Sequence, residues 1–117
     1  MPHNISTGRA ILEIGTGGGI DGRKLAMKNP EAQYYGIDIG YSVYFCNKSK
    51  YRKQNQRFIR ASALNLPFCD NSFDIAYSYG VFHHTPNPDL AFAEAVRVLK
   101  PGGALYTYFY MKSMKIT

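Results

Sequence analysis

The chain has 117 residues, a hydrophobic fraction of 45% and a formal net charge of +6. This length suits one domain, residues 1–117, that buries roughly two-thirds of its unfolded surface. No apolar stretch approaches the roughly 20 residues that span a bilayer, and residues 1–10 lack the apolar core of a signal peptide. Cys46 and Cys69 have no metal-ligand spacing, so they are expected to be reduced thiols of a cytoplasmic protein.

The first half of the chain alternates short apolar runs with segments of helical character. Asn29-Pro30 ends the first helical segment, because helices rarely cross such a pair. The second helical segment has poor apolar periodicity, so its extent is weakly defined by the pattern. The expected elements are strands at 10–14, 34–38 and 56–60 and helices at 20–28 and 42–54.

The second half continues the alternation after a loop at 66–72. The mostly apolar run at 73–78 suits a strand that is buried on both faces. Asn87 as N-cap, Pro88 at the first helical position and Asp89 near the positive end of the dipole predict the start of a helix.

That helix is expected to end at residues 100–103, and the fifth strand to cover 104–110. Its predicted inward stripe consists of Phe92, Val96 and Leu99. Alternating strands and helices predict an α/β fold with a doubly wound, mostly parallel sheet.

The glycine-rich segment after the first strand is the most informative part of the sequence. Residues 15–19 read Gly-Thr-Gly-Gly-Gly, and glycine lets a backbone turn sharply and approach a ligand closely. Asp38 ends the second strand, where an acidic side chain can accept hydrogen bonds from ribose hydroxyls. The two features together predict a site for a nucleoside cofactor.

The residues around the glycines distinguish between nucleosides. A dinucleotide site needs a third small residue at position 20, where this chain has the large Ile20. Glu13, two residues before Gly15, would repel a pyrophosphate and suits a ligand that carries positive charge. Both features argue against an oxidoreductase that uses a nicotinamide dinucleotide.

With these residues in place, the sequence resembles the class I S-adenosylmethionine-dependent methyltransferases. Segment 61–75 is similar to the adenine-side loop and fourth strand of that family. Segment 81–103 resembles the subgroup that includes ubiquinone and menaquinone biosynthesis enzymes and many small-molecule methyltransferases. The resemblance covers about residues 10–110. It implies a Rossmann-like fold and methyl transfer from S-adenosylmethionine to a small-molecule acceptor.

The resemblance also implies roles for individual residues. The backbone of Gly15 and Gly17 would meet the methionine half of the cofactor, with Glu13 acting near its ammonium group, through water or by ordering the loop. Asp38 would accept both ribose hydroxyls, and Ile39 would pack on adenine. The alternatives are a Glu13 that caps local amides, an Asp38 that caps the next helix and an Ile39 that belongs to the core. The expected cofactor-binding set is Glu13, Gly15, Thr16, Gly17, Gly19, Asp38, Ile39, Ser62, Ala63 and Ser78.

The adenine-side loop departs from the family pattern. The family usually has an acidic residue followed by a small one, and these positions are Ser62 and Ala63 here. A serine can accept from the adenine amino group, but without charge it should bind less strongly. His83 and His84 follow the fourth strand on the acceptor side, and either could be a general base. The alternative for the two histidines is a structural or solvent-facing position.

The positive charge is concentrated in residues 48–60, which contain six basic residues and no acidic one. Such a run could form a surface for nucleic acid or another acidic partner. The alternative is a solvated helix whose charges keep the protein soluble.

The family sheet normally has seven strands and an N-terminal helix over the cofactor. About five strands are expected here, without the last two, so the chain resembles a truncated domain or one completed by self-association. The apolar strand 104–110 would then be an exposed edge that pairs with another copy. A non-catalytic S-adenosylmethionine-binding or scaffold domain is the alternative function.

Overall fold

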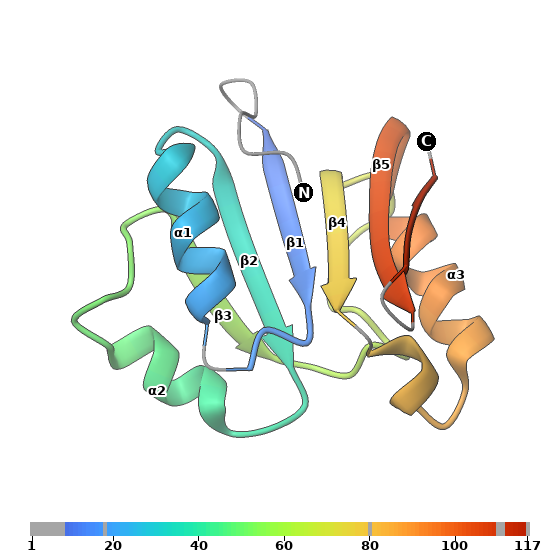
Figure 1. Cartoon of the computed structure of the whole chain (residues 1–117), viewed down its shortest axis with the longest axis horizontal. Coiled ribbons are helices and arrows are strands. Elements are labelled where there is room, and N and C mark those ends of the chain that lie inside the picture. Colours follow the sequence, from blue (N-terminus) through green and yellow to red (C-terminus); the bar gives the residue numbers. More distant parts are fainter. Residues whose placement is uncertain (1–8, 18, 80, 110–111, 117) are drawn as a thin grey trace.

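A six-stranded sheet forms the middle layer of the computed structural model, which describes residues 9–17, 19–79, 81–109 and 112–116 (Figure 1). The strand order is β3-β2-β1-β4-β5-β6. The strands are β1 (Ala10–Ile14), β2 (Gln33–Asp38), β3 (Gln56–Arg60), β4 (Phe73–Tyr79), β5 (Leu99–Phe109) and β6 (Lys112–Ile116). The helices are α1 (Ile20–Lys28), α2 (Ser42–Lys48) and α3 (Pro88–Val98), and η1 (Phe82–His84) is a single 3₁₀ turn.

Strands β1 to β5 are parallel, and the order of strands reverses between β1 and β4. The predicted doubly wound Rossmann-like sheet is therefore confirmed. In such a sheet, ligands bind beyond the carboxyl ends of the strands at the point of reversal. The ends of β1, β2 and β4 consequently define where a site should be sought.

Helices cover both faces of the sheet. Helices α1 and α2 lie beside β2 and β3, whereas α3 lies beside β5 (Figure 1). Side chains alternate along β1, so Ile11 packs on the face of α1 and α2, while Leu12 and Ile14 pack on the face of α3. The described residues therefore form two hydrophobic cores, one on each face of the sheet.

Helix α2 is shorter than the predicted helix at 42–54. It ends at Lys48, because Ser49 has extended backbone angles (φ −66°, ψ 138°). The Asn47 side chain ties the helix end to the edge strand: its Nδ2 donates to the Phe58 carbonyl at 2.7 Å, and its Oδ1 accepts from the Phe58 amide at 3.1 Å. Residues 49–55 form a connection rather than a helix, which corrects the prediction.

Helix α3 begins as predicted. The Asn87 side chain accepts a hydrogen bond from the Leu90 amide at 3.1 Å, and Pro88 occupies the first turn. This N-cap satisfies one of the amides that a helix start leaves without an internal partner.

The inward stripe of α3 differs from the prediction. The buried residues are Ala91, Ala95 and Val98. Phe92 is half-buried, Val96 is 42% exposed, and Leu99 is buried but follows the helix as the first residue of β5. Small side chains let the helix lie close to the sheet, so residue size was a poor guide to the buried face.

The C-terminal strands also correct the sequence prediction. Strand β5 begins at Leu99, which pairs with Phe73, and a register irregularity separates this pair from the one between Ile75 and Ala104. Strand β6 pairs antiparallel with β5, with Leu105 opposite Ile116. The sheet has six strands instead of about five, and β5 is not the open edge on which self-association was predicted. Tyr110, the last residue of that predicted edge, lies outside the described residues.

None of the helices within the described ranges is long and apolar enough to cross a membrane.

Candidate functional site

The glycine-rich segment wraps around the end of β2. The amides of Gly15 and Thr16 both donate to the Ile37 carbonyl, at 2.8 and 2.9 Å. Gly15 has a φ of +84°, and a Cβ at this position would overlap the Val81 side chain. The sequence needs glycine here because the backbone is left-handed and closely covered.

Asp38 joins this loop to the turn after β2. Its Oδ2 accepts from the Gly17 amide at 2.9 Å, and its Oδ1 accepts from the Gly40 amide at 2.9 Å. The N-cap of α2 is Tyr41, so the alternative in which Asp38 caps that helix is wrong. A carboxylate offers about four acceptor positions, so two remain for a ligand.

Glu13 is a buried carboxylate, 3% exposed, on the α1 and α2 face of β1. Its Oε1 accepts hydrogen bonds from the Thr16 hydroxyl at 2.7 Å and from the Tyr34 hydroxyl. Burial, and after it the Glu13 charge, raise the pKa of Tyr34 well above its usual value. Glu13 therefore holds the glycine loop through Thr16, and Tyr34 remains a neutral donor.

The sequence prediction missed the partner residue Gly22 in α1. A Cβ at Gly22 would overlap the Tyr34 hydroxyl, so Tyr34 reaches Glu13 only because this helical position has no side chain. Glycine within a helix costs about 1 kcal/mol relative to alanine, and that cost is a sequence signal for such a close approach.

A pocket of about 290 Å³ opens beside Asp38, at the carboxyl ends of β1 and β2. We call it the Asp38 pocket. Most of its wall is apolar, and its polar side chains are those of Asp38, Ser62, His84 and Thr85. Its lining residues are Ile14, Gly15, Ile37, Asp38, Ile39, Ala61, Ser62, Ala63, Leu64, Val81, His84, Thr85 and Pro86.

The Asp38 pocket brings together five of the ten predicted cofactor residues: Gly15, Asp38, Ile39, Ser62 and Ala63. Ile39 is 69% exposed, so the alternative that it belongs to the core is wrong. The other five predicted residues do not line this pocket: Glu13, Thr16, Gly17, Gly19 and Ser78.

Gly17 and Ser78 nevertheless have features of residues that face a ligand. Gly17 has a φ of +54°, and among the described residues no atom outside its chain neighbours lies within 4 Å of a Cβ built on it. Ser78 in β4 pairs with Ile14 at the end of β1 and is fully buried. Its hydroxyl has no hydrogen-bond partner in the described structure. Buried polar atoms are normally satisfied, so this hydroxyl is a group that a ligand or water would complete.

The adenine-side loop is held against α3. The Ser62 hydroxyl accepts from the Leu64 amide at 3.0 Å. Further along the loop, Glu94 accepts from the Leu66 amide at 2.8 Å, and Arg97 donates to the Leu66 carbonyl at 3.0 Å. Arg97 also donates to Glu94, and this hydrogen bond lowers the pKa of Glu94 below its usual value.

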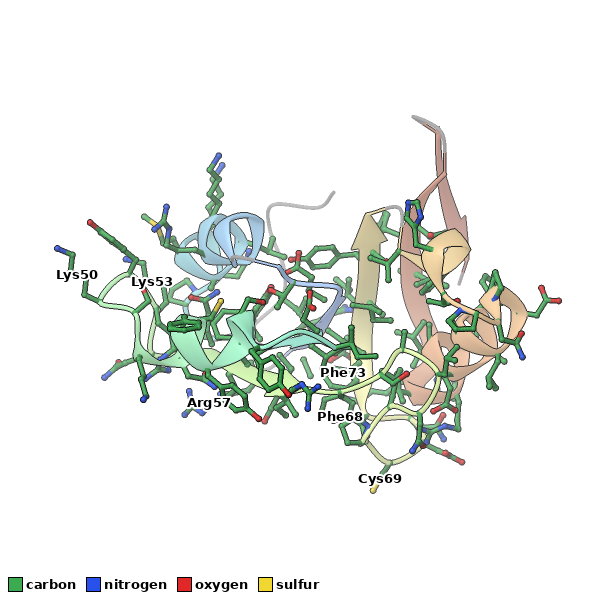
Figure 2. All side chains as sticks on the ribbon, turned by 90° about the horizontal axis from the view of Figure 1, so that it is seen from below. Lys50, Lys53, Arg57, Phe68, Cys69 and Phe73 are labelled. Carbon is green, nitrogen blue, oxygen red and sulfur yellow. The ribbon has the colours of Figure 1, made fainter. Side chains whose placement is uncertain are left out.

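An aromatic contact also holds this loop, because Phe68 in the loop packs against Phe73, the first residue of β4. The ring centroids of Phe68 and Phe73 lie 4.8 Å apart in an edge-to-face arrangement, and Figure 2 shows the two rings together. The wall of the Asp38 pocket is therefore fixed by contacts that lie outside the pocket.

The two candidate histidines lie in η1, directly after β4. His84 is exposed and lines the Asp38 pocket, whereas the side chain of His83 lies outside the described part of the structure. Val81, Thr85 and Pro86 complete this wall, and the sequence prediction did not name them.

Comparisons with known proteins agree with this geometry. A family described as "Methyltransferase domain" matches residues 12–107. The phthiotriol/phenolphthiotriol dimycocerosates methyltransferase of Mycobacterium tuberculosis is 35% identical over 82% of this chain and 36% of its own length. The fatty-acid O-methyltransferase of Mycolicibacterium smegmatis is 34% identical over 86% of this chain and 37% of its own length.

The fold is also similar to solved structures. The crystal structure of the cyclase SpnF superimposes with a TM-score of 0.78 at 29% identity, over 88% of this chain and 39% of SpnF. The chain thus spans little more than a third of the length of the proteins named here. With a family match over residues 12–107 and the glycine loop and Asp38 joined at the switch of strand order, the chain belongs to the methyltransferase-domain family.

Proposed function

We propose that this chain is an S-adenosylmethionine-dependent methyltransferase domain that acts on a small-molecule acceptor. The observation that carries the proposal is the Asp38 carboxylate, which binds the Gly17 amide at 2.9 Å on the edge of the Asp38 pocket. This arrangement joins a ribose acceptor to a glycine loop that can lie against the rest of the cofactor.

The chemistry of the Asp38 pocket fits the nucleoside half of this cofactor. Ile37, Ile39 and Ala63 offer apolar surface for adenine, and Asp38 has acceptor positions left for ribose. No lysine or arginine occurs among the described lining residues. At about 290 Å³ it lies at the small end of ligand sites, which run from about 300 Å³, and suits part of the cofactor.

The methionine half is assigned to the glycine loop. The open side of Gly17 leaves room for a ligand against its backbone. Glu13 is assigned the role of ordering this loop through Thr16, because its Oε1 is already engaged by two hydroxyl donors. The buried Ser78 hydroxyl is the further polar group assigned to this side of the site.

When bound, S-adenosylmethionine supplies an electrophilic methyl group, and transfer requires an acceptor atom held in line with it. His84 borders the Asp38 pocket and is assigned to take the proton from an oxygen or nitrogen acceptor, with His83 as the second candidate. The name of the mycolicibacterial relative points to an oxygen acceptor on a fatty acid, and we extend that to this chain only as a class of acceptor to test.

Calorimetry with S-adenosylhomocysteine and with NAD tests the cofactor assignment. We expect S-adenosylhomocysteine to bind and NAD not to bind, because Ile20 occupies the position where a dinucleotide loop needs a small residue. Tight NAD binding would contradict the proposal.

A tritiated-methyl assay with fractions of a cell lysate tests the reaction. We expect label in a small-molecule fraction, with loss of label in a His84→Ala variant if His84 removes the proton. Binding of S-adenosylhomocysteine without any transfer of label would favour the non-catalytic binding domain. Because the fold is shared with a cyclase, this direct assay is needed to assign the reaction.

A further inference from the structure

A second pocket lies at the β3 edge of the sheet, where α1 and the segment after α2 meet β3. Its volume is about 270 Å³, which is far above the roughly 10–15 Å³ that one buried water requires. We call it the Arg23 pocket. The side chains that bear on its chemistry are Arg23, Ser49, Tyr51, Arg52, Gln56 and Phe58.

Gln56 provides an unpartnered donor in the wall of the Arg23 pocket. This residue is 1% exposed, and its Oε1 accepts from the Lys53 amide at 2.9 Å. That bond fixes the orientation of the Gln56 side-chain amide, because a flipped amide would place its NH2 group against the Lys53 N–H. The Nε2 group has no partner within the described structure, so it is available to donate to a ligand.

Two guanidinium groups stand at the same pocket without an acidic partner. Arg52 is held by backbone carbonyls, with its Nε donating to Asn47 at 3.1 Å and its Nη1 donating to Gln56 at 2.8 Å. Arg23 lies 5.3 Å from the centre of the Tyr51 ring. Neither arginine forms an ion pair with a carboxylate among the described residues. Two arginines therefore line a pocket whose described lining contains no carboxylate.

From these contacts we propose that the Arg23 pocket binds the phosphate group of a small ligand. Guanidinium groups match the geometry of phosphate oxygens, and two of them suit its double negative charge better than the single charge of a carboxylate. The Gln56 amide adds a neutral donor, and Ser49 and Tyr51 line the same pocket. Tyr51 is 57% exposed, so its ring stands at the mouth of the pocket.

The placement of the basic run favours a small ligand over a nucleic acid. Residues 48–60 comprise the end of α2, a connection and β3 instead of one helix. Figure 2 shows Lys50 and Lys53 on the connection at the end of the molecule, whereas Arg57 lies on the side of β3 away from α1. The basic side chains of the run therefore point in several directions, and only Arg52 among them lines the Arg23 pocket, where it is joined by Arg23 from α1.

Titration with inorganic phosphate at constant ionic strength tests this proposal, with calorimetry as the readout. Gln56→Glu keeps the oxygen that caps Lys53 but replaces the donor with a negative charge, and Arg23→Gln removes one guanidinium. We expect each to weaken phosphate binding by about tenfold or more, since a hydrogen bond to a charged group is a strong contact. Arg57→Gln is the matched control, because it removes the same charge from the other side of β3 and should leave the affinity unchanged.

Circular dichroism shows whether each variant folds, and Arg23→Gln carries the test if Gln56→Glu does not. Failure of the wild-type chain to bind phosphate would overturn the proposal, as would equal losses in Arg57→Gln and Arg23→Gln. A single-stranded oligothymidylate provides the second arm. If it binds more tightly than phosphate and weakens in Arg57→Gln, the basic run is a nucleic-acid surface and the proposal is wrong. The test uses no nucleoside, so its outcome is independent of the proposed methyl transfer.

Discussion

The Asp38 pocket and the Arg23 pocket have nearly equal volumes, about 290 and 270 Å³, but opposite chemistry. The Asp38 pocket combines a carboxylate with apolar walls and contains no lysine or arginine in its described lining. The Arg23 pocket has two guanidinium groups and an unpartnered amide donor. Size alone therefore does not distinguish the proposed nucleoside site from the proposed phosphate site, whereas the charged groups in the wall do.

The two pockets also differ in where the fold places them. The Asp38 pocket lies at the reversal of strand order, and the Arg23 pocket lies at the β3 edge. They are connected through the glycine loop, because the thiol of Cys46, in the wall of the Arg23 pocket, donates to the Gly17 carbonyl at 3.5 Å. Substitutions that weaken binding at one pocket more than at the other test whether the two pockets bind different ligands.

The largest effect is expected for Asp38→Ala. This change removes the proposed ribose acceptor and the anchor of the Gly17 amide. Hydrogen bonds to a charged group contribute about 1.5–3 kcal/mol each, so affinity for S-adenosylhomocysteine should fall about 10- to 100-fold or more. Asp38→Asn should fall between the wild type and alanine. Phosphate binding at the Arg23 pocket is the comparison and should fall far less, because Asp38 reaches that pocket only through the Gly17 loop and Cys46.

Calorimetry measures both affinities, and a thermal melt records the stability of each variant. A lower melting temperature with unchanged affinity for S-adenosylhomocysteine would assign Asp38 a structural role only.

Gly17→Ala should have the next largest effect. Its φ of +54° makes a left-handed alanine cost about 1–2 kcal/mol of stability, but its Cβ would meet no protein atom within 4 Å. The fold should persist, while the methyl group blocks close approach of the ligand and lowers affinity about tenfold or more. The larger Gly17→Val should lower the affinity for S-adenosylhomocysteine further than Gly17→Ala does.

Gly15→Ala is the contrasting variant, since its methyl group would overlap Val81 and should impair folding itself. If Gly17→Ala bound S-adenosylhomocysteine as tightly as the wild type, the loop would be only a turn.

Tyr34→Phe should lower stability by about 1–3 kcal/mol, because it removes a donor from the buried Glu13 carboxylate. The raised pKa of Tyr34 adds a pH signature. Its contribution is complete below the usual tyrosine pKa of about 10 and is lost as the pH rises toward the folded-state pKa, because only the unfolded chain then ionises. Stability of the wild type should therefore fall above about pH 10, and the variant should lose less over that range. Denaturant unfolding between neutral and alkaline pH measures this, and identical slopes for both chains would contradict it.

The smallest effect is expected for Glu94→Gln, which weakens the attachment of the adenine-side loop to α3 by about 1 kcal/mol. The pKa of Glu94 is lowered in the folded state, so its contribution is present above the usual carboxyl pKa and is lost as the pH falls through the lowered value. Acid unfolding of the wild type and the variant should therefore converge at low pH. A variant that stays less stable by a constant amount at every pH would contradict this account.

The sequence predicted the elements whose pattern or end signals are local. Strand β1, helix α1 and the Asn87 cap of α3 are confirmed, because their apolar runs and end residues are signals within a few adjacent residues. Strand β6 was not predicted, since its residues form a strand only by pairing with β5. The buried Ala91 and Ala95 were missed because closeness to a sheet selects for small residues, and the sequence pattern does not report that distance.

The candidate site shows the same division. Gly15 and Asp38, which line the Asp38 pocket, could be singled out because a turn and a strand end have sequence signals. The contact between Gly22 and Tyr34 and the wall formed by Val81 depend on segments that are distant along the chain, and one sequence does not show which of them meet.

The two hydrogen bonds of Asp38 order the Asp38 pocket before a ligand binds. Because Asp38 already accepts from the Gly17 and Gly40 amides, both loops around the Asp38 pocket are set before any ligand arrives. Association then requires little ordering of the chain, and pre-ordered sites lose less conformational entropy on binding. Adenosine alone should consequently bind without a change in the backbone of the pocket. The Gly17 amide should exchange its hydrogen slowly even in the ligand-free protein.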